Sequence, residues 1–427
     1  MSQVDLAVLG LQAPYLGPGP VDLFLSGPKV AQLTPAQSQP VPSGAKTMKG
    51  AGLILLPGLS DAHVHLREPG FEWKETIATG LTAAAKGGFA NIMCMANTDP
   101  VNDCAAVTQA MREKAAQAHP FGPRLWPIGA LTVGLEGKGL APMAELAASG
   151  CKALSNDGRP VLSSEIFRRA LEYASDLGLM VIDHCEDPYL APGAGINEGA
   201  VSAELGLRGQ PTAAEAIQVA RDVVLAAYLG KPIHLAHISC GQSVDIIRQA
   251  KAQGAPITAE TCPHYLVFDE SACLGYNTAA KVSPPLRTRE DQQALLAALA
   301  DGTIDILATD HAPHAAHEKE TPFEEAPNGI SGLETALALT WGLVKSGAIT
   351  AQTLVAAWCW RPGEIFGLPV NRFQPGDPAD FILFDPEAAW TVTSETLASK
   401  GKNTPCLGQT LKGLVRANFV AGKNVLK

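Results

Sequence analysis

Two histidines that stand two residues apart close an apolar segment in the first part of the chain. They are His63 and His65, in the run PGLSDAHVHLREPG. Residues i and i+2 of a β-strand point to the same side, so both imidazoles project into one space. Two such imidazoles can bind a zinc ion, but a pair of structural or solvated histidines has the same spacing. The motif alone therefore leaves both interpretations open.

Further potential ligands follow the ends of four later apolar segments, namely Asp157, His184, His237 and Asp310. Four histidines and two carboxylates are a common ligand set for a hydrolytic site with two zinc ions. Active sites of (β/α)8 barrels are built from the carboxyl ends of several strands. This distribution predicts a site with two Zn²⁺ per chain.

The other histidines receive different interpretations. His234 stands three residues before His237, so we expect it to face the opposite side of its strand, between barrel and helices. His119 and His317 are expected to be solvated, and His311 is expected to point away from the metal while still able to orient a ligand. For His264 a supporting and a purely structural role both stay open.

The elements that must position these residues show the alternation of a parallel α/β fold. Eight apolar segments alternate mostly with stretches of helical spacing; they span 52–66, 89–97, 124–131, 151–158, 179–187, 232–239, 256–266 and 303–314. Eight strands with intervening helices predict a (β/α)8 TIM-type barrel. Short runs at both chain ends predict a small β domain formed from the two ends. We expect its parts at 1–55 and 371–427, with the catalytic barrel at 56–370.

Composition excludes several classes of function. The 427 residues are 46% hydrophobic and carry a formal net charge of −10, without a basic run that would indicate nucleic-acid binding. No run of 18 apolar residues indicates a membrane span, and the first residues lack the features of a signal peptide. Nine cysteines without a Cys-x-x-Cys pair are typical of reduced thiols. We therefore expect a cytoplasmic enzyme for a small-molecule substrate.

A series of motifs extends this prediction by resemblance. DAHVHLREPG, MANTDP, SNDG, HCED, AHIS, SPPLR, ATDHAPH and SKGKNTP resemble, in order and spacing, the class I dihydroorotases of the amidohydrolase superfamily, from about residue 57 to 410. The resemblance implies an amidohydrolase barrel with two zinc ions. It also implies reversible hydrolysis of L-dihydroorotate to N-carbamoyl-L-aspartate, a step of pyrimidine biosynthesis.

The same resemblance implies a role for each ligand. His63, His65 and Asp310 would hold one zinc, His184 and His237 the other, and Asp157 would bridge them. Asp310 would also be the catalytic proton acceptor. Many relatives use a carbamylated lysine as the bridge, but Lys152 stands five residues before the bridging position.

Substrate contacts are implied for His65, Arg67, Asn97, Ser283, His314, Asn328 and Gly329. Arg67 and Asn97 match positions that hold the substrate carboxylate, and His314 matches one near the ring carbonyl. Asn328 and Gly329 match a backbone contact to the ring. A guanidinium suits a carboxylate, and Arg67 is expected on the strand face of the two histidines. The alternative for Arg67 is a surface salt bridge with Glu68.

Three positions depart from the family pattern. Ala96 stands where proline is common and Asn156 where aspartate is common, and neither is expected to bind metal. Ser283 replaces an asparagine that normally contacts the substrate. The shorter serine removes an amide donor, which a bridging water could replace.

Two rival functions are considered. A hydantoinase or allantoinase would use the same barrel, normally with a lysine bridge, and Asp157 together with Arg67 and Asn97 argues against it. A non-catalytic scaffold for aspartate transcarbamoylase is disfavoured because all six ligands are present. Homodimerisation and partnership with that transcarbamoylase stay open.

Overall fold

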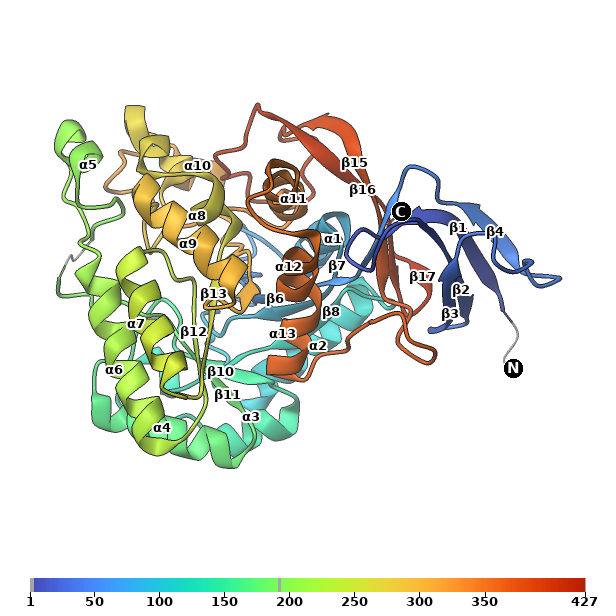
Figure 1. The fold of residues 1–427 in the computed structure, drawn as a ribbon. Coiled ribbons are helices and arrows are strands. Elements are labelled where there is room, and N and C mark those ends of the chain that lie inside the picture. The colour runs from blue at the N-terminus through green and yellow to red at the C-terminus, as the bar shows by residue number, and fades with distance from the viewer. Residues whose placement is uncertain (1–3, 191–192, 427) are drawn as a thin grey trace.

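The two ends of the chain join in one eight-stranded sheet. In the computed structural model, which describes residues 4–190 and 193–426, its strand order is β17-β16-β15-β5-β1-β2-β3, with β4 paired to β1. The strands are β1 (Leu6–Gln12), β2 (Pro20–Ser26), β3 (Lys29–Pro35), β4 (Lys46–Lys49), β5 (Ile54–Pro57), β15 (Phe381–Thr391), β16 (Thr410–Val420) and β17 (Lys423–Asn424). Figure 1 shows this blue and red sheet beside the α/β part of the chain. Antiparallel pairing of Leu56 with Ile382 joins the two halves.

Parallel strands in chain order form the rest of the protein. One sheet contains β6 (Leu59–Val64), β7 (Phe89–Cys94) and β8 (Arg124–Pro127). The other contains β9 (Gly129–Ala130), β10 (Ala153–Ser155), β11 (Met180–Asp183), β12 (Ile233–Leu235), β13 (Ile257–Thr261) and β14 (Ile306–Leu307). Each of the eight predicted segments therefore contains a strand. The first also contains β5, which pairs within the sheet of the chain ends, so that segment serves both parts.

Contacts link the two parallel sheets on both sides. Ile128, between β8 and β9, donates its N–H to the Cys94 carbonyl at 2.8 Å. On the other side, Val64 forms a parallel bridge with His311, and the His65 N–H donates to the His311 carbonyl at 2.8 Å. Asp61 reinforces this side, since its carboxylate accepts the N–H and hydroxyl of Thr309. The carboxyl ends of the first and last strands are thereby held together.

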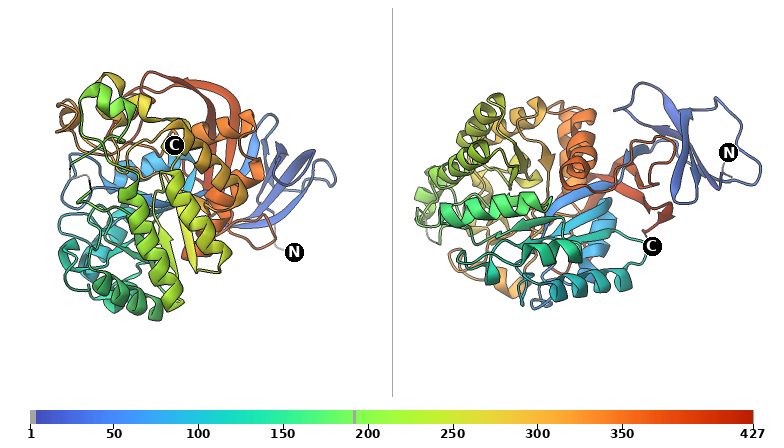
Figure 2. Two further views of the ribbon diagram at one scale, coloured as in Figure 1. Left: turned by 60° about the vertical axis from the view of Figure 1, so that its left-hand side comes forward. Right: turned by 90° about the horizontal axis from the view of Figure 1, so that it is seen from below.

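Helices cover the outside of the parallel strands (Figures 1 and 2). They are α1 (Ile77–Gly87), α2 (Ala105–Ala118), α3 (Met143–Ser149), α4 (Ser164–Asp176), α5 (Ala200–Leu205), α6 (Ala213–Leu229), α7 (Gly241–Ala252), α8 (Pro263–Val267), α9 (Arg289–Asp301), α10 (Ala316–Lys319), α11 (Ala336–Ser346), α12 (Ala351–Val355) and α13 (Arg361–Phe366). Local sequence sets several ends. The Thr76 hydroxyl accepts the Thr79 N–H at the start of α1, and Gly88 ends that helix at φ 90°.

A small apolar cluster lies between the two parallel sheets and α13. It comprises Ala62, Met93, Met95, Ile128, Ala153, Ile182, Ala236, Ile306, Phe366 and Leu368. Phe366 and Leu368 reach it from α13 and the residues that follow. This closely packed apolar cluster supports the strands and holds their carboxyl ends in fixed positions.

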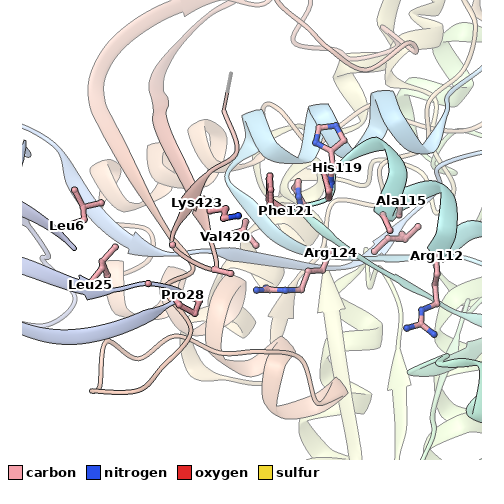
Figure 3. A pocket seen from close by; sticks show the side chains of 18 of the residues that line it. Leu6, Leu25, Pro28, Arg112, Ala115, His119, Phe121, Arg124, Val420 and Lys423 are labelled. Atoms are coloured by element: carbon pink, nitrogen blue, oxygen red, sulfur yellow. The ribbon is translucent and has the colours of Figure 1, made fainter. Parts of the chain in front are cut away.

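A cavity of about 720 Å³ lies between α2, β8 and the sheet of the chain ends. Figure 3 shows its lining, which includes Arg112, Phe121, Arg124, Val420 and Lys423. It shares no lining residue with the pocket at the carboxyl ends of the parallel strands. Within 4–190 and 193–426, no helix combines the length and apolarity that a membrane crossing requires.

Candidate metal centre

A pocket of about 220 Å³ opens at the carboxyl ends of the parallel strands. It is lined by His65, Arg67, Asn97, Asp157, Gly158, His184, Glu186, His237, Val282, Ser283, Asp310, Ala312, Asn328 and Gly329. Ten of these positions, including His65 and Asp310, were predicted as metal ligands or substrate contacts. The structure brings residues from most of the strand ends into one small space.

Four histidines surround the Asp157 carboxylate. Its Oδ1 lies 3.4 Å from His63 Nε2, 3.4 Å from His184 Nδ1 and 3.5 Å from His237 Nε2, and its Oδ2 lies 3.4 Å from His65 Nε2. Two groups could each hold a cation, one with His63 and His65 and one with His184 and His237, and Asp157 belongs to both. Asp310 joins the first group, with Oδ1 3.1 Å from His65 Nε2 and 3.5 Å from His63 Nε2.

Hydrogen bonds on the far side of the His63 and His65 rings fix which nitrogen of each faces this cluster. His65 Nδ1 lies 2.9 Å from Asn97 Oδ1, and His63 Nδ1 lies 2.7 Å from a Glu260 carboxylate oxygen. Those oxygens accept, so both Nδ1 atoms carry the proton and both Nε2 lone pairs face Asp157 and Asp310. Buried His63 Nε2 and Asp157 Oδ1 have no hydrogen-bond partner in the described part of the chain. The donor set fits divalent cations.

Electrostatics favour ionised carboxylates here. Burial opposes ionisation of Asp157, but the surrounding histidines hold its pKa well below the usual range. The same balance of burial against His63 and His65 lowers the pKa of Asp310. Burial also opposes protonation of His184, yet Asp157 and Glu186 raise its pKa to about 10. A bound cation would take the place of those protons.

Three site residues adopt a left-handed backbone: Arg67 at φ 61°, His237 at φ 34° and Asp310 at φ 45°. Such conformations are costly for residues other than glycine and concentrate at functional sites. They also correct one expectation. β6 ends at Val64, so Arg67 does not share a strand face with His63 and His65; the turn at Arg67 brings it to the pocket.

Arg67 is held from behind by the chain after β14. Its Nε donates to the Pro313 carbonyl at 3.2 Å. His314 Nε2 lies 3.3 Å from Arg67 Nη2 but only 2.9 Å from the Asn328 carbonyl, which can only accept, so Nε2 carries a proton and does not accept from Arg67. Both Nη groups of Arg67 therefore remain available to a ligand. Glu68, the alternative partner, pairs with Lys114.

The predicted contacts after β14 divide into two kinds. Asn328 and Gly329 line the pocket, whereas His314 lies behind Arg67 and is absent from the lining. Burial and the nearby cations Arg67 and Lys74 lower the pKa of His314 to about 2. Gly329 has φ 147°, and a Cβ there would approach the Ala312 carbonyl oxygen to 2.6 Å. A side chain at position 329 would therefore clash with the Ala312 backbone beside the pocket.

Ser283 contacts a residue that the sequence analysis did not identify. Its hydroxyl donates to Glu186 Oε2 at 2.8 Å, and the same Glu186 oxygen lies 3.5 Å from His184 Nε2. Both residues line the pocket. Glu186 follows His184 by two positions in HCED, and that spacing is the signal that could have found it.

The interpretation of His234 was wrong. His234 does not lie between strands and helices; it pairs with Ile182 of the interior cluster and packs edge-on against Phe366. The strand ends at Leu235, and the left-handed turn at His237 changes the direction of the His237 side chain. The spacing of three residues between His234 and His237 therefore did not show which face of the strand His234 occupies. Its Nε2 lies 3.1 Å from Glu260 Oε2.

The remaining histidines lie outside the cluster. His311 faces Glu75 at 3.5 Å, and His317 is exposed. His119 is half-buried and contacts the Thr82 hydroxyl at 3.0 Å, so it is not simply solvated. His264 is buried in α8. Lys152 precedes β10, at the opposite end of the strand from Asp157, and its Nζ lies 5.3 Å from the Trp126 ring centroid.

Comparisons with known proteins show which family the chain resembles. A family described as dihydro-orotase-like matches residues 52–243. The chain is 50% identical over 386 residues to a dihydroorotase of Geobacter metallireducens, covering 90% of this chain and 91% of that one. It is 47% identical over 407 residues to a dihydroorotase of Syntrophus aciditrophicus, covering 95% of each.

Solved structures of similar fold include hydantoinases. The L-hydantoinase (dihydropyrimidinase) from Arthrobacter aurescens superposes with a TM-score of 0.86 at 22% identity, covering 100% of this chain and 96% of that one. The D-hydantoinase (dihydropyrimidinase) from Thermus sp. gives 0.83 at 24% identity, covering 99% and 95%. At this identity the likeness concerns the fold, an α/β domain of parallel strands with an attached β domain.

Proposed function

The chain belongs to the dihydroorotase family, and from that membership we propose that its pocket hydrolyses L-dihydroorotate reversibly to N-carbamoyl-L-aspartate with two zinc ions, on a closed (β/α)8 barrel. The observation that carries the metal assignment is the position of Asp157 among four histidines within 3.5 Å. His63, His65 and Asp310 would hold one ion, His184 and His237 the other, and Asp157 both. Such ions polarise a carbonyl and lower the pKa of water.

Asp310 is the proposed proton carrier. It accepts a proton from the water that attacks the ring amide carbonyl, and it returns that proton to the ring nitrogen when the C–N bond breaks. Although burial opposes ionisation, its pKa lies below the usual range because His63 and His65 stabilise the charged form, so the carboxylate is ionised. His314 is a poor alternative, because it lies behind Arg67 and does not line the pocket, whereas Asp310 does.

Arg67 and Asn97 are the proposed recognition elements for the substrate carboxylate. Support comes from the free Nη groups of Arg67, which form a planar fork that matches a carboxylate. Asn97 lines the same pocket and also holds His65 in place. Asn328, Gly329 and Ser283 complete the proposed ring contacts.

A hydantoinase activity is the main rival, since the similar solved structures carry that name. Against it stand the aspartate between the histidine pairs and the distance of Lys152 from them. The test compares three substrates on zinc-loaded protein: dihydroorotate, hydantoin, and dihydrouracil, which lacks the carboxylate. We expect dihydroorotate to be preferred by at least an order of magnitude in kcat/KM. Equal or greater activity on hydantoin would contradict the proposal.

A further inference from the structure

A charged group lies beneath the metal-ligand cluster, where apolar side chains otherwise fill the interior. Glu260 of β13 is fully buried, and its carboxylate accepts three hydrogen bonds. Oε1 lies 2.7 Å from His63 Nδ1 and 3.3 Å from the His237 backbone nitrogen, and Oε2 lies 3.1 Å from His234 Nε2. One carboxylate therefore contacts two candidate ligands that come from different strands.

The proton positions in this network are fixed by what each group can do. A carboxylate only accepts, so His63 and His234 both donate to Glu260. His234 Nδ1 must then accept, and the Thr258 hydroxyl lies 2.8 Å away as its donor. Donation therefore runs from Thr258 through His234 to Glu260, and His63 donates to the same carboxylate from the other side, which leaves the Nε2 lone pair of His63 facing Asp157.

The surroundings of Glu260 argue against a purely space-filling role for its side chain. Ile182, Ala236 and Ile306 occupy neighbouring interior positions, and the Phe366 ring packs against His234 at 5.2 Å between centroids. Burying a charge in such surroundings is costly unless it is fully hydrogen-bonded. β13 contributes none of the six candidate ligands, so the charge stands where it can act on ligands from its neighbours.

We propose that Glu260, held by His234, is a positioning residue that sets the metal affinity of the site. It fixes the tautomer and ring orientation of His63, and it anchors the backbone at the strained residue His237. Outer hydrogen-bond partners of ligating histidines commonly have this effect on metal binding. The inference rests on the proposed function only in taking His63 and His237 as zinc ligands.

The test compares Glu260→Leu, Glu260→Gln and the control Asp380→Asn. Glutamine keeps an oxygen for His63, and His234 can accommodate the amide by moving its proton to Nδ1. Asp380 is equally buried but pairs with Arg124 between the barrel and the sheet of the chain ends. Zinc affinity is measured on folded protein by competition with a chromophoric chelator, and Co²⁺-loaded samples give visible spectra that report ligand geometry.

We expect Glu260→Leu to weaken zinc binding about 10- to 100-fold and to alter the cobalt spectrum. Glu260→Gln should stay within a few-fold of wild type, and Asp380→Asn should lower Tm without changing zinc affinity. Folded Glu260→Leu with wild-type zinc affinity and cobalt spectrum would overturn the proposal.

A second pair of variants tests the proposal if the Glu260→Leu protein does not fold. His234→Leu should weaken zinc binding, and His234→Gln, whose amide can still donate to Glu260, should restore it; equal affinities in the two would overturn the proposal. Wild-type protein that binds zinc but leaves dihydroorotate intact would contradict the proposed function alone, because the comparison of zinc affinities does not depend on turnover.

Discussion

Replacement of Arg67 by methionine separates recognition of the substrate carboxylate from chemistry on the ring. Methionine keeps an unbranched stem and is no more strained than arginine at φ 61°, so the turn should persist. Among residues 4–190 and 193–426, the guanidinium donates through Nε–H to the Pro313 carbonyl, and the Nη groups have no acceptor. The change therefore removes the whole Nη fork and costs the fold one long hydrogen bond.

The magnitude follows from the charge on the pair. A hydrogen bond between charged partners contributes about 1.5–3 kcal/mol. At about 1.4 kcal/mol per factor of ten, loss of this contact should lower kcat/KM for dihydroorotate about 13- to 160-fold. Most of the effect should appear in KM, because the carboxylate is bound equally in the ground state and the transition state.

The assay follows ring opening of dihydroorotate and of dihydrouracil by ultraviolet absorbance. Dihydrouracil has the same ring without the carboxylate, so its slower hydrolysis should be unaffected by Arg67→Met. Arg112→Met is the matched control, since Arg112 lines the remote cavity and donates to the Ser149 carbonyl. An unchanged KM for dihydroorotate, or equal losses on both substrates, would refute the role of Arg67 as the carboxylate clamp.

Three further predictions concern Asp310, Ser283 and His264. Asp310→Asn should retain most of its zinc but lose turnover about 100- to 10,000-fold, whereas His63→Ala should lose zinc itself; zinc content and kcat on both decide, and near-normal turnover of Asp310→Asn would exclude it as the base. Ser283→Asn should lower KM for dihydroorotate about 2- to 13-fold, the effect of one hydrogen bond of about 0.5–1.5 kcal/mol, and an unchanged KM would mean that serine bound to Glu186 already suffices. Burial lowers the pKa of His264 to about 4, so between pH 6.5 and 4 the unfolded chain binds a proton that the folded chain does not. The free energy of unfolding should therefore decrease by up to about 3 kcal/mol as the pH is lowered through that window. His264→Phe should show a smaller change in Tm over the same pH range. An identical pH profile of Tm in both proteins would contradict this.

Strand-end positions were predictable because they depend on local pattern. An apolar run that stops at a histidine or aspartate marks both the strand and its carboxyl end. This logic identified Asp157, His184 and Asp310, which line one pocket, and His63, which contacts two of them. Alternation of strand and helix also predicted the parallel order of the strands. These features were predictable because each depends on a short stretch of consecutive residues.

Features created by turns and by distant contacts were not predictable in the same way. Left-handed turns at Arg67 and His237 redirect side chains after the strands end, so neither the face of Arg67 nor that of His234 followed from strand periodicity. Glu260 contacts a histidine 197 positions away. Its only local signal was a charge inside the buried strand β13, which could have marked it for attention.

The pairing of β5 with β15 has a consequence for how the chain must assemble during synthesis. Phe381 pairs with Pro57, so β5 acquires this neighbour only after about 320 further residues have been made. At roughly 5 to 20 residues per second, the ribosome needs on the order of 16 to 65 s to deliver it. Throughout that interval the four wholly buried residues of β5 present an open, apolar sheet edge. The nascent N-terminal half therefore exposes an edge that favours aggregation, and a chain truncated before β15 should aggregate.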